Sequence, residues 1–134
     1  MTKLNDVVVE GDFGQDPINL QFLGDAPTGL QIQVLHTGSG DKIPDLKTRV
    51  EVNYHGQIWG GKVFDSSFIR GKSITFGLNQ VIKGWGEALV GQTVGSRILV
   101  SIPPEYGYGS RGVPQAGIGD EDILVFVVDI LGIE

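Results

Sequence analysis

The 134 residues of this chain are enough for one domain with a buried core, and 40% apolar with 19% charged residues is typical of a globular protein rather than a disordered one. Sixteen acidic residues against ten basic residues give a net charge of −6, which argues against general nucleic-acid binding. The absence of cysteine excludes disulfides, thiolate catalysis and zinc–thiolate sites, and no apolar run approaches the roughly 20 residues that span a bilayer.

Residues 1–10 mix acidic and basic side chains with a short valine run, which is not the pattern of a secretory signal. We therefore expect a cytoplasmic monomer without membrane contact, although a chain without cysteine also suits export.

Glycine and proline interrupt the first 28 residues, and one alternating apolar run remains there, at Ile18, Leu20 and Phe22. We predict an N-terminal extension at 1–28 that either adds a short strand to the edge of a sheet or stays a loose tail. Residues 29–134 then form the main domain.

Alternating apolar residues predict half-buried antiparallel strands in the main domain. In the strand with Val50, Val52 and Tyr54 on its apolar side, the other side carries Glu51, Asn53 and His55. His55 is therefore expected to face solvent. The segment 123–131 is apolar except for Asp129, which indicates a central strand covered on both faces. The alternating sets are Leu30, Ile32 and Val34, then Val50, Val52 and Tyr54, then Ile98, Val100 and Ile102.

One segment changes to helical spacing, with Asn79 as the expected N-cap and Gly91 as the expected stop. A single short helix among strands predicts an α+β fold, a sheet wrapped over one helix. The apolar residues at helical spacing are Val81, Ile82, Trp85, Ala88 and Leu89.

Two familiar signals are weak. Residues 107–112 spell G-x-G-x-x-G, but a phosphate-binding loop must open a helix, and Pro114 and Gly117 follow instead. The two histidines, His36 and His55, belong to no metal-ligand spacing, and no nucleophile elbow accompanies them. No cofactor or metal is expected.

The chain is, by contrast, rich in aromatic residues near turns. Core packing is the ordinary explanation for any one of them. The tyrosines favour a binding site over plain core packing, because a buried tyrosine needs a partner for its hydroxyl group. These aromatic residues are Tyr54, Phe64, Trp85, Tyr106, Tyr108 and Phe126.

Six motifs follow one another in an order that is hard to attribute to chance. They are VEVNYHG (50–56), FDSS (64–67), VIKGW (81–85), VGSR (94–97), IPPEYGYG (102–109) and LVF (124–126). Over about residues 29–132 the chain resembles the FKBP-type peptidyl-prolyl cis/trans isomerases, the receptors of tacrolimus and rapamycin. This resemblance implies a curved antiparallel sheet half-wrapped around one short helix.

The resemblance also implies a pocket with the Trp85 indole as its floor. Tyr108 and the Ile82 amide would donate hydrogen bonds to substrate carbonyls, and Asp65 would be the polar group inside, with Arg70 beside it. Tyr54, Phe64 and Phe126 would form aromatic walls, Val81 and Ile82 an aliphatic edge, and Ile118 would be part of the rim loop. Ile74 departs from the family, because many members have an aromatic wall there.

The implied activity is isomerisation of X-Pro bonds during protein folding, inhibited by tacrolimus or rapamycin. It breaks no covalent bond and needs no strong acid or base, which suits the missing histidine chemistry. Two rivals stay open: a module that holds a proline peptide or macrolide without turnover, and a folding helper that holds unfolded chains. For Asp65, capping a turn ahead of Ser66 and Ser67 is the alternative to a role in the pocket.

Overall fold

The computed structural model describes residues 7–17, 20–24, 26–109, 112–113, 117–119 and 121–134. In these residues strands make up most of the regular structure, with one α-helix of two turns and one of a single turn. In chain order the elements are β1 (Val7–Val9), β2 (Leu20–Phe22), β3 (Gln31–His36), β4 (Arg49–Ile58), β5 (Val63–Ser66), α1 (Ser67–Arg70), β6 (Ile74–Gly77), the 3-10 helix η1 (Leu78–Gln80), α2 (Lys83–Leu89), β7 (Arg97–Ile102), the 3-10 helix η2 (Pro104–Tyr106) and β8 (Leu124–Ile133).

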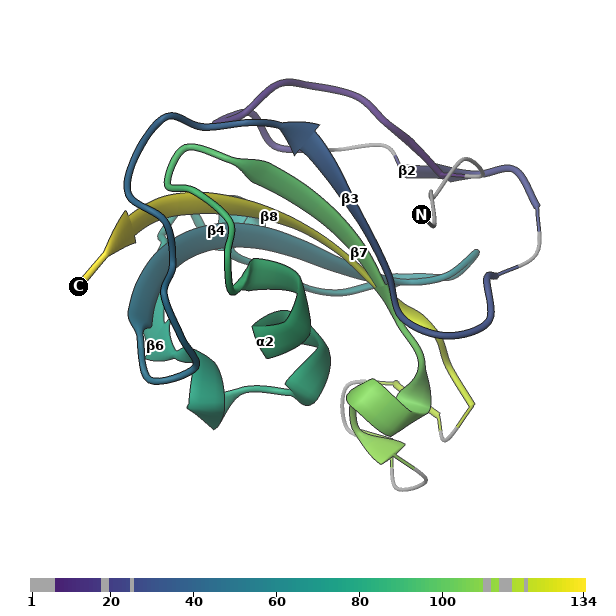
Figure 1. Cartoon of the computed structure of the whole chain (residues 1–134). Helices are drawn as coiled ribbons and strands as arrows, with labels where there is room; N and C mark the ends of the chain where they lie inside the picture. Colours follow the sequence, from purple (N-terminus) through teal and green to yellow (C-terminus); the bar gives the residue numbers. More distant parts are fainter. Residues whose placement is uncertain (1–6, 18–19, 25, 110–111, 114–116, 120) are drawn as a thin grey trace.

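A curved antiparallel sheet is built from β3 to β8 (Figure 1). Its strand order is β3-β7-β8-β4-β5, and β6 pairs with the first half of β4 while β5 pairs with the second half. Strand β8 lies between β7 and β4, and its residues from Leu124 to Ile130 are buried. The prediction of a central strand covered on both faces is thus confirmed.

Helix α2 lies in the concave side of this sheet (Figure 1) and buries Trp85, Ala88 and Leu89 against it. Gly84 permits the close approach, because a Cβ atom there would lie 2.8 Å from the Ile102 side chain. The predicted α+β class, a curved antiparallel sheet around one main helix, is confirmed.

The start of α2 differs from the prediction. The helix begins at Lys83 with Ile82 as N-cap, and Asn79 lies in the separate turn η1. Val81 is extended between them, with φ −123° and ψ 174°, so the two turns cannot join. Gly91 follows the helix at φ +90°, a conformation that suits glycine, as expected for the stop.

The N-terminal segment does not extend the main sheet. In the described residues β1 and β2 pair with each other and form a separate two-stranded sheet, so the prediction of an added edge strand is wrong; Ile18 lies outside the described residues. Val7 packs with Leu99, Val125 and Val127 on the convex side of the main sheet, opposite α2 (Figure 1). Burial of this second apolar face is the physical reason for the arrangement.

His55 is also placed differently from the prediction. Its side chain points to the convex side as the alternation requires, yet only 2% of the residue is exposed. It pairs across the ladder with Val127, which belongs to the cluster that includes Val7. Alternation identifies the face of a strand but not what later covers that face.

A buried ion pair attaches the N-terminal segment to the sheet. Arg97 Nε donates to Asp129 Oδ1 at 2.6 Å, and the two side chains are 1% and 0% exposed. The amide of Gly14 donates to Asp129 Oδ2 at 2.8 Å, and Arg97 Nη1 donates to the carbonyl of Gly11 at 3.2 Å.

In the part of the chain described, no helix is long and apolar enough to cross a membrane.

Candidate active site

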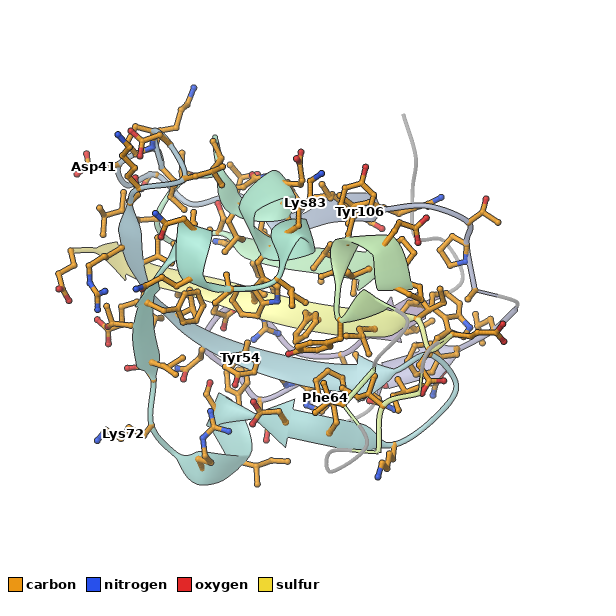
Figure 2. The ribbon with its side chains drawn as sticks, turned by 90° about the horizontal axis from the view of Figure 1, so that it is seen from below. Asp41, Tyr54, Phe64, Lys72, Lys83 and Tyr106 are labelled. Carbon is orange, nitrogen blue, oxygen red and sulfur yellow. The ribbon has the colours of Figure 1, made fainter. Side chains whose placement is uncertain are left out.

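A cavity of about 470 Å³ opens on the concave side of the sheet, beside α2. In Figure 2, Tyr54 and Phe64 lie on this face of the molecule. Sheet, turn and helix all contribute to its lining, which brings together residues from Tyr54 to Phe126 of the sequence. The lining residues are Tyr54, Phe64, Asp65, Ile74, Phe76, Gln80, Val81, Ile82, Trp85, Tyr108 and Phe126.

Trp85 is the centre of the aromatic packing. Its ring meets those of Tyr54, Phe76 and Phe126 edge-to-face, with centroid distances of 5.3, 5.1 and 5.2 Å. Phe64 meets Phe126 in the same way at 5.5 Å. Edge-to-face pairs contribute about 0.5–1.5 kcal/mol each beyond the burial of their area. The rings therefore hold one another in place and keep the cavity preformed.

Phe76 is an aromatic lining residue that the prediction missed. We expected a weaker wall around Ile74, which lines the cavity but is aliphatic and 39% exposed. Phe76 comes two positions later on β6, where the period of a strand turns a side chain to the same face. That alternation was a usable signal. Gln80, in η1, also lines the cavity, and the strand and helix periods carried no signal for it.

The polar edge of the cavity is a group of three side chains. The Asp65 carboxylate accepts a hydrogen bond from the Tyr54 hydroxyl and pairs with the Arg70 guanidinium. Arg70 Nη2 also donates to the Tyr54 hydroxyl at 3.3 Å. Burial, and next the hydrogen bond to Asp65, raise the pKa of Tyr54 above its ordinary value. Tyr54 thus keeps its proton and has its hydroxyl held by two charged partners.

The two serines after Asp65, and not Asp65 itself, cap and anchor the turn α1. Ser66 is the N-cap of α1, accepting from the amide of Ile69 at 3.3 Å. The buried Ser67 accepts from the Tyr54 amide at 2.7 Å and donates to Asn53 at 2.9 Å, which ties α1 to β4. Ser66 therefore caps the turn, while the Asp65 carboxylate lines the cavity with Tyr54 and Arg70 as its partners.

Two hydrogen-bond donors remain available to a ligand. The Tyr108 side chain lines the cavity, is 41% exposed and makes no hydrogen bond to a described residue. Burial, and then the charge of Asp65, raise its pKa above the ordinary value, so the hydroxyl stays a donor near neutral pH. Ile82 lines the cavity at the N-cap of α2, and the structure gives its amide no acceptor among the described residues.

Nine of the eleven predicted site residues line the cavity, and two do not. Arg70 stands behind Asp65 rather than in the lining. Ile118 is only 4% exposed, packs in the main core and is bridged to Val113, and it does not line this cavity. Of the neighbouring loop, residues 110–111, 114–116 and 120 lie outside the described part.

Gly56 sets the spacing of two wall residues. A Cβ atom at this position would lie 2.8 Å from the Phe64 ring and 2.9 Å from the Phe126 ring. We expect Gly56→Ala to lower the free energy of unfolding by about 1–3 kcal/mol through overpacking and to shift the ring NMR signals of both phenylalanines. Gly132→Ala is the matched control, because nothing lies within 4 Å of its Cβ position in the same sheet. Equal losses in the two variants would contradict the proposed packing.

Comparison with known proteins places this site in a family. The model of FKBP-type peptidyl-prolyl cis-trans isomerases matches residues 40–131. The chain is 42% identical over 106 residues to the peptidyl-prolyl cis-trans isomerase Mip of Coxiella burnetii, covering 79% of this chain and 45% of that protein. It is 38% identical over 108 residues to FK506-binding protein 1A of Neurospora crassa, covering 79% of this chain and 89% of that protein.

A solved structure agrees with this match. The crystal structure of FkpA from Escherichia coli superposes with a TM-score of 0.73 at 43% identity, covering 80% of this chain and 49% of that one. The fold agrees with the α+β class, a curved antiparallel sheet around one main helix. The chain belongs to the FKBP-type peptidyl-prolyl cis-trans isomerase family, as the ordered motifs predicted. It spans less than half the length of the bacterial Mip relative.

Proposed function

We propose that this chain is a peptidyl-prolyl cis/trans isomerase that rotates X-Pro bonds of client proteins in the Trp85 cavity and so assists their folding. The observation that carries the proposal is the preformed aromatic cavity with only a few hydrogen-bond donors at its edge. An apolar pocket with sparse polar groups suits a proline ring flanked by peptide carbonyls.

The proposed mechanism is non-covalent. Twisting an X-Pro amide through a barrier of about 18–20 kcal/mol destroys its C–N resonance, which places negative charge on the carbonyl oxygen. Water stabilises that planar, polar form. Transfer into walls formed by Tyr54, Trp85 and Phe126 removes the water, so the planar ground state loses more stabilisation than the less polar twisted state. An acceleration of ~10⁵ requires about 7 kcal/mol.

The polar groups orient the substrate in this proposal. The Tyr108 hydroxyl and the Ile82 amide donate to carbonyls on either side of the twisting bond. Asp65 fixes the Tyr54 hydroxyl and, through it, the ring that forms one wall. Arg70 acts through Asp65 and is a positioning residue.

Tacrolimus and rapamycin are expected to occupy the same cavity. The support is the family assignment together with the relative whose name describes it as binding FK506, another name for tacrolimus. Inhibition by these macrolides would follow, because they and the proline ring compete for the same aromatic lining.

NMR exchange spectroscopy on a short X-Pro peptide tests the proposal. Catalytic amounts of the protein should accelerate cis/trans interconversion, and an equimolar macrolide should abolish the acceleration. Tight binding of the macrolide without any acceleration would overturn the isomerase proposal and favour a binding module. Prevention of aggregation without acceleration would favour a holding chaperone.

The pH dependence follows from the tyrosines. Because the pKa values of Tyr54 and Tyr108 are raised, both hydroxyls stay protonated, and kcat/KM should be flat from about pH 6 to about pH 9. Stability from the protonated hydroxyls is fully present below about pH 10, the unfolded value, and is lost as the pH rises through the folded pKa values. Exchange rates and thermal unfolding at stepped pH check this. A drop in kcat/KM near pH 8 would contradict it.

A further inference from the structure

A second cavity adjoins the first at Ile74, which lines both. It has a volume of about 450 Å³, and its other lining residues are Arg70, Lys72 and Ser73. These residues belong to the end of α1 and the turn that leads into β6. Among the described residues, the lining of this second cavity therefore includes two cationic side chains and no carboxylate.

Only one of the two cationic side chains of this cavity forms an ion pair with a residue that the structure describes. Arg70 forms an ion pair with Asp65, whose side chain lines the first cavity. Glu51 stands outside the lining and accepts a hydrogen bond from Ser73 at 2.6 Å. Lys72 is exposed and forms no ion pair with any residue that the structure describes. The lysine is thus available to an incoming anion.

The charge distribution along the chain strengthens this local observation. Residues 61–83 supply seven of the eleven residues that line the first cavity. This segment carries four basic residues against one acidic residue, a net charge of +3, although the whole chain carries −6. In Figure 2, Tyr54 lies between Lys83 and Lys72, and the Lys72 side chain projects outward from the edge of the molecule.

We propose that the second cavity is a subsite for an anionic side chain of the client, a carboxylate or a phosphate, one to three residues from the proline. An extended chain advances about 3.3–3.6 Å per residue, so a peptide leaving the first cavity over Ile74 reaches Lys72 within a few residues. The subsite would make acidic proline segments preferred substrates. It rests on the proposed isomerase function and adds a specificity to it.

The test compares peptides that differ only in charge. Glutamate, glutamine or phosphoserine is placed in turn at each of the three positions before and after proline, and both kcat/KM and Kd are measured at low and moderate salt. On one side of proline, the anionic peptides should exceed the glutamine peptide by about two- to fivefold, as for an exposed ion pair, and salt should reduce the ratio. Lys72→Gln should bring the ratio close to one.

Two controls separate the subsite from the isomerase itself. Lys47→Gln, an exposed lysine that lines a different groove, should leave the ratio unchanged, and Lys72→Gln should leave turnover of the glutamine peptide unchanged. An anion preference that is absent, or that survives in Lys72→Gln, overturns the subsite. Failure of the glutamine peptide to be turned over concerns the isomerase proposal, and the Kd ratios still decide on the subsite.

Discussion

Phe126→Ala is expected to reduce kcat/KM for X-Pro isomerisation by about a hundredfold, which corresponds to about 2.7 kcal/mol of transition-state stabilisation. Phe126 is 3% exposed and contacts the rings of Phe64 and Trp85, so its removal opens two walls of the cavity to water. The same truncation should lower the free energy of unfolding by about 3–5 kcal/mol. Exchange spectroscopy at a temperature where the variant is folded measures the first effect, and denaturant unfolding measures the second.

The control for this variant is another aromatic residue outside the cavity. His55→Ala would serve poorly, because His55 is buried. Phe22→Ala removes a ring that packs on Trp59 at 5.0 Å on the convex side, so it should reduce stability while kcat/KM for folded protein stays within about twofold. Equal losses of kcat/KM in the two variants would mean that the cavity does not contain the reacting bond.

Asp129→Asn is expected to lower the free energy of unfolding by about 3–5 kcal/mol. The substitution leaves the guanidinium of Arg97, which is 1% exposed, buried without its counter-charge. It also weakens the acceptor of the Gly14 amide, so the N-terminal segment should loosen. Denaturant unfolding measures the first effect, and faster hydrogen exchange of the Val8 and Val9 amides than in the native protein measures the second.

Two comparisons make this prediction decisive. Arg49→Ala removes an exposed pair with Glu134 at 3.3 Å and should change stability by at most about 1 kcal/mol. The double variant Arg97→Met/Asp129→Leu replaces both charges with apolar groups and should recover most of the loss. A loss in Asp129→Asn as small as that in Arg49→Ala would contradict the account of the buried pair.

Much of the fold and the cavity could be predicted from the sequence. Period-two alternation located β3, β4 and β7, and the apolar run around Asp129 located the central strand β8. Helical spacing located α2, while the ordered motifs contain eight lining residues of the cavity, and the family resemblance added Ile74. These signals lie within single segments or in family motifs, so the sequence was enough to predict these strands, this helix and this lining.

What the sequence did not indicate depends on contacts between distant segments. His55 is buried on the convex side, where the cluster that includes its ladder neighbour Val127 also takes in Val7 of the N-terminal segment. Ile118 packs in the core because of its bridge to Val113. No periodicity within one segment reports such placements.

In the proposed function, the X-Pro bond turns inside the cavity over Trp85. Transferred nuclear Overhauser effects between an exchanging X-Pro peptide and the protein test it most directly. We expect contacts from the proline ring protons to the Trp85 indole and the Phe126 ring, and these contacts should be lost together with catalysed exchange when tacrolimus is added. Catalysed exchange with the proline ring in contact with another surface, or unaffected by tacrolimus, would contradict it.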